Sequence, residues 1–299
     1  MYHCIVNPDA GRRSGKEWAY TVKSFMNEHG KDVAIKEAQS AAEASQWVHQ
    51  ACLADSEGII AVGGDGTVQA IVTGMLQNVK KCETPLGIIS CGSGNDLVRS
   101  FGYWPKNEKG FLPQIIKGKQ RTIDAIRVND KACLNIANIG LDVRIVRNSL
   151  KYKQFLGKRA YLASAFVSIA LHENIHLRIQ IYDEGRESEI EGPFTLAAIC
   201  NGQYYGGGMR ITPPAQIDDG HITLCLVSAL SRAKVLVLFP AMLLERHTNL
   251  KAVRFIQCQR CIITPQEGET LCIDGNLIEC AAPLEFELLP GAIKVFWDC

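Results

Sequence analysis

The order of apolar and polar residues divides the chain into two parts. Before residue 122, short runs rich in Ile, Val and Leu alternate with longer helical patterns. The runs lie at 3–8, 58–62 and 85–90, and the helical patterns lie at 14–30, 40–54 and 67–79. Nearly continuous apolar runs are typical of parallel strands that helices cover on both faces. Residues 1–122 are therefore predicted to form an α/β domain of the nucleotide-binding type.

After about residue 121, apolar and polar residues alternate with a period of two, which is typical of strands with one buried face. The alternating segments are 122–128, 131–137, 175–183, 194–202, 221–229 and 284–298, and in the last of these Pro290-Gly291 indicates a turn between two strands. Helical patches at 157–172 and 231–246 interrupt them. Residues 123–299 are predicted to form a β-sandwich domain, and the final segment is left free to return toward the first domain.

The second helical patch, 231–246, is apolar almost all round and contains Pro240. A helix of this kind is usually buried and slightly kinked, so a core position is predicted. The alternative is that one face is open and guides an acyl chain.

Three glycine loops follow the apolar runs of the first domain: "NPDAG" (7–11), "GGDGT" (63–67) and "CGSGND" (91–96). A strand that feeds a glycine loop and then a helix brings bare main-chain N–H groups and the positive end of the helix together, which suits phosphate. Asp65 alone would repel phosphate, so its presence favours a Mg²⁺–nucleotide complex or a ribose hydroxyl as the partner. The loops are expected to line one cleft at the carboxyl edge of the sheet.

Composition adds limits on location and partners. Lys and Arg number 32 against 31 Asp and Glu, so no overall positive field favours nucleic acid. No apolar run reaches the roughly 20 residues of a membrane-spanning helix, so no transmembrane segment is predicted. The first residues lack the pattern of a signal peptide, so a cytoplasmic location is expected, with the 12 cysteines as free thiols.

Taken together, the motifs resemble the diacylglycerol kinase catalytic-domain family of lipid kinases, which includes bacterial diacylglycerol kinases and sphingosine kinases. The resemblance covers nearly the whole chain through "NPDAGRRSGK", "GGDGT", "GSGNDLVRSFG", "NGQYYGGGMRITPPAQIDDGHITL" and "CIDGN". It implies an N-terminal domain like that of phosphofructokinases and NAD kinases. It also implies transfer of the γ-phosphoryl group of ATP, with Mg²⁺, to a hydroxyl of diacylglycerol or a related lipid at the membrane surface. A homodimer is left open.

The resemblance implies roles for particular residues. The residues implied to contact ATP are Asn7, Pro8, Gly11, Gly63, Gly64, Asp65, Gly66, Thr67, Gly92, Ser93, Gly94 and Asn95. A structural Mg²⁺ is implied beside the Asp219 carboxylate and the main-chain oxygen of His221, although Gln216 stands where bacterial members have a second carboxylate.

The implied catalytic residues are Asp274 and Asn276, in "CIDGN", and they are expected at the cleft between the domains. Many members of the family have Asp-Gly-Glu here, and Asn-Glu where this chain has Gln69-Ala70. A general base contributes about 10²–10⁴ in rate, whereas phosphoryl transfer depends mostly on positioning and charge stabilisation. A slower enzyme that relies on Asp274 is therefore expected.

Two other functions stay open. A small-molecule kinase of the NAD kinase type would share "GGDGT", but it should carry an Asn-Glu pair where this chain reads "NIANIGLD" (135–142). A catalytically impaired lipid- or nucleotide-binding regulatory protein is favoured by Gln69, Ala70 and Asn276.

Overall fold

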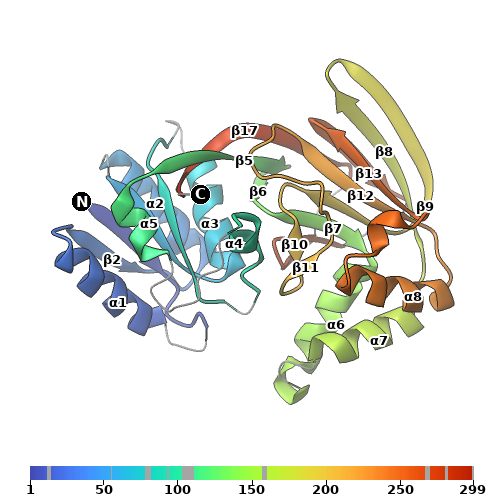
Figure 1. Ribbon diagram of the computed structural model, residues 1–299, viewed down its shortest axis with the longest axis horizontal. Helices are drawn as coiled ribbons and strands as arrows, with labels where there is room; N and C mark the ends of the chain where they lie inside the picture. Colours follow the sequence, from blue (N-terminus) through green and yellow to red (C-terminus); the bar gives the residue numbers. More distant parts are fainter. Residues whose placement is uncertain are drawn as a thin grey trace.

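The computed structural model describes nearly the whole chain, as two domains side by side (Figure 1). The described residues are 1–11, 15–54, 56–77, 82–92, 94–102, 111–156, 160–266, 270–279 and 282–297, with the backbone alone at 149–156, 160–163 and 166.

The N-terminal domain contains a parallel sheet in the strand order β2–β1–β3–β4. Its strands are β1 (Tyr2–Val6), β2 (Val33–Glu37), β3 (Gly58–Gly63) and β4 (Leu86–Ser90), and its helices are α1 (Gly15–Glu28), α2 (Ala41–Leu53), α3 (Asp65–Leu76), α4 (Asp96–Ser100) and α5 (Leu112–Lys117). Successive residues of β1 face opposite sides: Cys4 and Val6 pack in the cluster with α1 and α5, and Ile5 packs in the cluster with α2 and α3. Because both faces are covered, β1, β3 and β4 are mostly apolar, as predicted. The edge strand β2, which was not predicted, ends in Lys36 and Glu37 and is less buried.

The C-terminal domain is mostly antiparallel sheet, with helices gathered at one end (Figure 1). Its strands are β5 (Gln120–Val128), β6 (Lys131–Cys133), β7 (Ile136–Gly140), β8 (Ile175–Asp183), β9 (Arg186–Cys200), β10 (Tyr204–Tyr205), β11 (Met209–Arg210), β12 (Ile222–Ser228), β13 (Val253–Cys258), β14 (Arg260–Pro265), β15 (Thr270–Ile273), β16 (Asn276–Glu279) and β17 (Leu284–Phe296). Its helices are α6 (Leu141–Leu156), α7 (Ala160–Ala170) and α8 (Arg232–Leu243), followed by a 3₁₀ turn at His247–Asn249. Inward side chains such as Ile139, Ile199 and Phe286 form one core between the strands. The predicted fold class, an α/β domain followed by a β-sandwich-like domain, is confirmed.

The last strand, β17, runs through both domains. The expected turn at Pro290-Gly291 is wrong: β17 continues through it with a register shift between Leu289 and Ile293. The buried Asp124 stabilises this irregularity, because its Oδ1 accepts a hydrogen bond from the Gly291 N–H at 2.7 Å. Beyond it, Val295 pairs with Leu86 of β4. The predicted domain boundary at 122/123 falls inside β5, which pairs along β17, and it stays a prediction.

Helix α8 corrects another expectation. Val235, Leu238 and Met242 are buried as predicted, but the opposite face is exposed, so this is not a buried core helix. Neither α8 nor any other helix among the described residues combines the length and apolar character needed to cross a bilayer.

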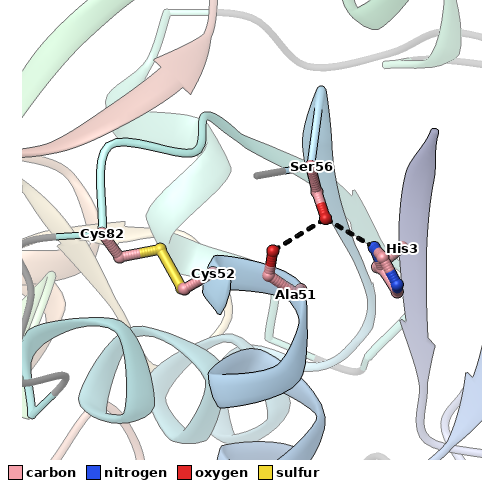
Figure 2. The surroundings of a disulfide bond; sticks show 5 residues. All are labelled: His3, Ala51, Cys52, Ser56 and Cys82. Atoms are coloured by element: carbon pink, nitrogen blue, oxygen red, sulfur yellow. Dashed lines mark hydrogen bonds between the residues drawn. A yellow bond between two sulfur atoms is a disulfide. The ribbon is translucent and has the colours of Figure 1, made fainter. Parts of the chain in front are cut away.

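The prediction of free thiols is wrong for two of the cysteines. Cys52, in the last turn of α2, forms a disulfide with Cys82, which precedes β4 (Figure 2). The fold brings their Cα atoms to 5.6 Å, within the usual range for a disulfide. Beside it, the Ser56 hydroxyl joins His3 Nδ1 to the carbonyl oxygen of Ala51 and fixes the connection into β3. Eight other cysteines in the described parts of the chain are free.

Candidate active site

The glycine loops of the N-terminal domain and the segment around Asp274 line one cleft of about 2300 Å³ between the domains. The predicted site residues that line it are Asn7, Gly11, Gly64, Asp65, Gly66, Thr67, Gly92, Gly94, Asn95, Asp274 and Asn276. Pro8 and Gly63 lie beside these loops and are not among the lining residues, and Ser93 lies outside the described residues. Sequence positions far apart thus meet at the carboxyl edge of the parallel sheet.

The loops after β3 and β4 touch each other through main-chain atoms. A Cβ atom placed on Gly92 would lie 2.6 Å from the Cα of Gly64, closer than real side chains allow. The loop after β1 joins them, because Asn7 Nδ2 donates to Thr67 Oγ1 at 3.4 Å. Glycine is required here so that two backbones can approach closely. The result is a surface of main-chain groups at the N-terminus of α3, which Gly64 caps.

The carboxylate of Asp65 holds the second loop in place. Its Oδ2 accepts a hydrogen bond from the Asn95 N–H at 2.8 Å, and its Oδ1 accepts one from the Asp96 N–H at 3.1 Å. Asn95 has a left-handed backbone with a φ of 57°, and its Nδ2 donates to the Gly92 carbonyl oxygen. Burial raises the pKa of Asp65, and these main-chain donors oppose that rise. Asp65 therefore ties two glycine loops together, which is a role the sequence did not reveal.

Asp274 occupies the first position of a two-residue hairpin between β15 and β16. Asp274 and Gly275 have φ values of 48° and 86°, and Ile273 pairs with Asn276. Positive φ at both central residues defines a type I′ turn, for which Asp-Gly is a favoured sequence. The backbone conformation of this turn thus explains why Asp-Gly occupies positions 274 and 275. The pairing of β15 with β7 places the turn beside Ile136.

The side chain of Asp274 reaches across to the segment that joins β6 to β7. Its Oδ1 accepts hydrogen bonds from the Asn135 and Ile136 N–H groups, both at 3.0 Å, and a weak one from Cys133 Sγ at 3.5 Å. Its Oδ2 accepts one from the Leu134 N–H at 2.9 Å. Burial raises the pKa of Asp274 to about 6 despite these donors. Oδ1 is saturated, so Oδ2 is the oxygen with room for a further proton.

Asn276 contacts the N-terminal domain through hydrogen bonds between uncharged amide groups. Its Nδ2 donates to Gln69 Oε1 at 2.8 Å, and Gln69 Nε2 donates to the Ala132 carbonyl oxygen at 3.2 Å. Gly66 permits this approach, because a Cβ there would lie 3.2 Å from the amide of Asn276. Asn276, which stands where many members of the family have Glu, therefore pairs with the amide of Gln69 across the cleft.

The predicted metal residues lie away from the cleft lining. Asp219 Oδ1 accepts a hydrogen bond from the His221 N–H at 3.0 Å, and Gln216 is exposed. In the described parts of the chain, no three or more His, Cys, Asp or Glu side chains gather as metal ligands would. One carboxylate with an amide is a poor set for Mg²⁺, which favours carboxylate and phosphate oxygens. The residues do not fit the ion well, and this metal site stays a prediction.

Three further polar residues of the site were not predicted. Lys131, on β6, is the one cationic side chain among the described residues that line the cleft. Asn138, on β7, also lines it and donates through Nδ2 to Oδ2 of Asp142, at the start of α6. Asp142 is almost fully buried, and burial raises its pKa to about 7. A polar residue inside an apolar strand, such as Asn138 in "NIANIG", is the signal that could have been used.

Comparison with protein families gives two matches that together cover almost the whole chain. The diacylglycerol kinase catalytic domain matches residues 1–128, and the YegS C-terminal NAD kinase beta sandwich-like domain matches residues 135–297. The chain therefore belongs to the diacylglycerol kinase and YegS-like family of lipid kinases.

Individual relatives agree with this family. A protein named diacylglycerol kinase from Mycobacterium tuberculosis (strain CDC 1551 / Oshkosh) is 27% identical over 97% of this chain and 93% of its own length. A protein named "Probable lipid kinase YegS-like" from Pseudomonas aeruginosa (strain UCBPP-PA14) is 27% identical over 95% of this chain and 91% of its own. The crystal structure of a diacylglycerol kinase from Bacillus anthracis str. Sterne matches with a TM-score of 0.81 at 22% identity, over 100% of this chain and 97% of that one. At that identity the structural likeness shows the fold.

Proposed function

We propose that the protein transfers the γ-phosphoryl group of ATP to a hydroxyl of diacylglycerol or a related lipid, in the cytoplasm at the membrane surface. The observation that supports this most is the shared cleft. Glycine loops with bare main-chain groups, which suit phosphate, lie on one side, and the Asp274 carboxylate from the other domain lies on the same cleft.

The glycine loops fit a nucleotide. Gly64 and Gly92 approach so closely that a Cβ would fill the space between them, and the bare backbone ends at the N-terminus of α3. Main-chain N–H groups and the helix dipole there would hold the phosphates. ATP, with Mg²⁺, would supply the phosphoryl group and neutralise part of its charge. Lys131 is placed to add a positive charge on the acceptor side.

Asp274 would orient the lipid hydroxyl and take its proton at Oδ2. The main-chain donors of residues 134–136 hold the carboxylate in one orientation. With a pKa of about 6, the group is mostly ionised at neutral pH and still basic enough to accept a proton. Asn276 has no proton-accepting role, since its amide is neutral and bound to Gln69.

A direct test combines binding and turnover. The purified protein with Mg·ATP is assayed against a panel of diacylglycerol, phosphatidylglycerol, a sphingoid base and NAD. We expect the wild-type protein to phosphorylate a lipid of this panel. In Gly64→Val we expect loss of ATP binding, measured by calorimetry, because the new side chain would meet Gly92 Cα. Phosphorylation of NAD with no lipid product would instead assign the small-molecule class, and full ATP affinity in the folded variant would refute the nucleotide site.

The pairing of Asn276 with Gln69 favours a second candidate, a regulatory protein that binds ATP or lipid without turnover. Asn276→Glu distinguishes the two. An inactive wild type that gains lipid phosphorylation in this variant, by a factor of up to about 10²–10⁴, would identify an impaired kinase. A wild type with substantial turnover would exclude that reading.

A further inference from the structure

Exposed apolar side chains gather on the helices of the C-terminal domain. Ten large hydrophobic side chains are exposed among the described residues, and seven belong to α7, α8 and the turns that follow them. These seven are Val167, Leu171, Leu236, Val237, Leu243, Leu244 and Leu250. A concentration of this kind marks an interaction surface, whereas single exposed apolar residues do not.

Helix α8 presents two apolar faces. One face packs into the domain through Val235, Leu238 and Met242. The exposed residues Leu236, Val237, Pro240, Leu243 and Leu244 follow the spacing i, i+1, i+4, i+7 and i+8, which places them on one stripe. This stripe lies on the side of the helix opposite the buried residues, so its apolar side chains are exposed to water. We call it the α8 stripe.

The ends of the α8 stripe are basic. Arg232 and Lys234 lie in the first turn of α8, and Arg246 lies just beyond its last turn, all three exposed. Lys234 and Arg246 form no ion pair with any residue that the structure describes. The acidic neighbour Glu245 is paired with Arg210, so the stripe carries net positive charge at its borders.

The helix that carries the α8 stripe packs in a group of three helices, and one of them also borders the cleft on the side of Asp274, where the acceptor lipid would bind. Helix α6 begins directly after β7, and its Val146 lines the cleft. Helix α7 packs against α6 and α8 over a small core that includes Ile145, Ile169 and Val235 (Figure 1). A surface that holds α8 would therefore also hold the helices that border the acceptor side.

We propose that the α8 stripe docks on a lipid bilayer that contains anionic headgroups. Leucine and valine side chains enter the acyl boundary, and Lys234 and Arg246 contact the headgroups, as expected of an interfacial helix. A second copy of the chain fits less well, because a two-fold interface would bring the same basic ends together. The proposal rests on a lipid as the acceptor, and it adds the surface through which the enzyme reaches that lipid.

The test measures sedimentation with vesicles of phosphatidylcholine alone or mixed with phosphatidylglycerol. Val237→Ser/Leu244→Ser should lower the partition onto mixed vesicles by about tenfold or more. Lys234→Gln/Arg246→Gln should lower it by about fivefold for each charge at low salt, with little effect on the weak binding to phosphatidylcholine alone. The matched control is Leu53→Ser on α2, since Leu53 and Leu244 are exposed to 64% and 65%; it should bind as the wild type does.

Kinase assays with a dispersed short-chain diacylglycerol separate this proposal from the proposed function. The α8 variants should keep that activity and lose activity on vesicles. If the variants keep both their activity on vesicles and their vesicle binding, the docking proposal is overturned and the kinase assignment stays intact. Stripe-dependent vesicle binding in a protein that phosphorylates no lipid would overturn the kinase and keep the surface. A dimer that the apolar variant dissociates, seen by light scattering, would assign the stripe to a second copy and overturn the bilayer.

Discussion

The two sides of the cleft are built in different ways. On the side proposed to bind ATP, here called the nucleotide side, the loops after β3 and β4 meet through main-chain atoms, and their shape depends on the absence of side chains at Gly64 and Gly92. On the side proposed to bind the lipid, here called the acceptor side, one carboxylate from a hairpin at Asp274 is held by amides of residues 134–136, some 140 positions earlier in the chain.

This difference predicts that nucleotide binding and catalysis can be changed independently of each other. A side chain added to the glycine loops would change their shape, and with it the space for phosphate. A side chain changed at Asp274 would leave those loops as they are and remove one charged group. Substitutions on the two sides should therefore affect ATP affinity and turnover separately.

The largest effect is expected on the acceptor side. Asp274→Asn should lower the rate of lipid phosphorylation by about 10²–10⁴, because the only carboxylate expected to accept the hydroxyl proton is lost. Affinity for Mg·ATP, measured by calorimetry, should change little, since ATP would lie on the other domain. An equal loss of ATP affinity would show that the two sides are not separable, and unchanged turnover would move the chemistry away from Asp274.

The matching change on the nucleotide side is Gly92→Ala. The new Cβ would lie 2.6 Å from Gly64 Cα, and the loops must separate to admit it. Strain of this kind costs about 1–3 kcal/mol, so the affinity for Mg·ATP should fall by roughly ten- to hundredfold. Turnover at saturating ATP should be affected less than affinity. If calorimetry gives the wild-type affinity for a folded Gly92→Ala protein, the close contact between the loops is not needed for binding.

The pKa of Asp274 predicts how turnover depends on pH. Burial raises this pKa to about 6, and the proton acceptor is the ionised form. Turnover should therefore fall as the pH drops through about 6, by up to tenfold for each further unit. For stability the sign is opposite: a carboxyl with a raised folded pKa favours the folded state at low pH and loses that contribution as the pH rises. The pH profile of kcat for wild type tests this, and a profile that is flat down to pH 5 would contradict it.

The same contrast explains what the sequence could predict. The strands, helices and glycine loops of the first domain depend on neighbours in sequence, so β1, β3, β4 and the loops that follow them are where the patterns place them. The contacts of Asp274 and Asp65 depend on strand pairing over long separations, which no local pattern encodes. The resemblance to the family implied a catalytic role for Asp274, which stays a prediction, but it did not show what holds its carboxylate.

The errors have physical causes of the same kind. Pro290-Gly291 has turn composition, yet hydrogen bonding from Gly291 to the distant Asp124 keeps β17 continuous. The Cys52–Cys82 disulfide depends on where α2 ends relative to β4. The helical segment 231–246 is apolar almost all round, and only the packed structure shows which face stays exposed.

The smallest effect concerns the amides that join the two sides. Gln69→Ala removes the acceptor of Asn276 Nδ2 and the donor to the Ala132 carbonyl oxygen. Hydrogen bonds at an exposed site contribute about 0.5–1.5 kcal/mol each, so turnover should change by only about fivefold, and Asn276→Ala should have a similar effect. Because the two residues contact each other, the double variant should be no worse than either single one, and a thermodynamic cycle on kcat/KM measures this coupling. If the losses of kcat/KM in the two single variants add up in the double variant, Gln69 and Asn276 act separately. The hydrogen bond between their amides would then not be what couples the two domains at this cleft.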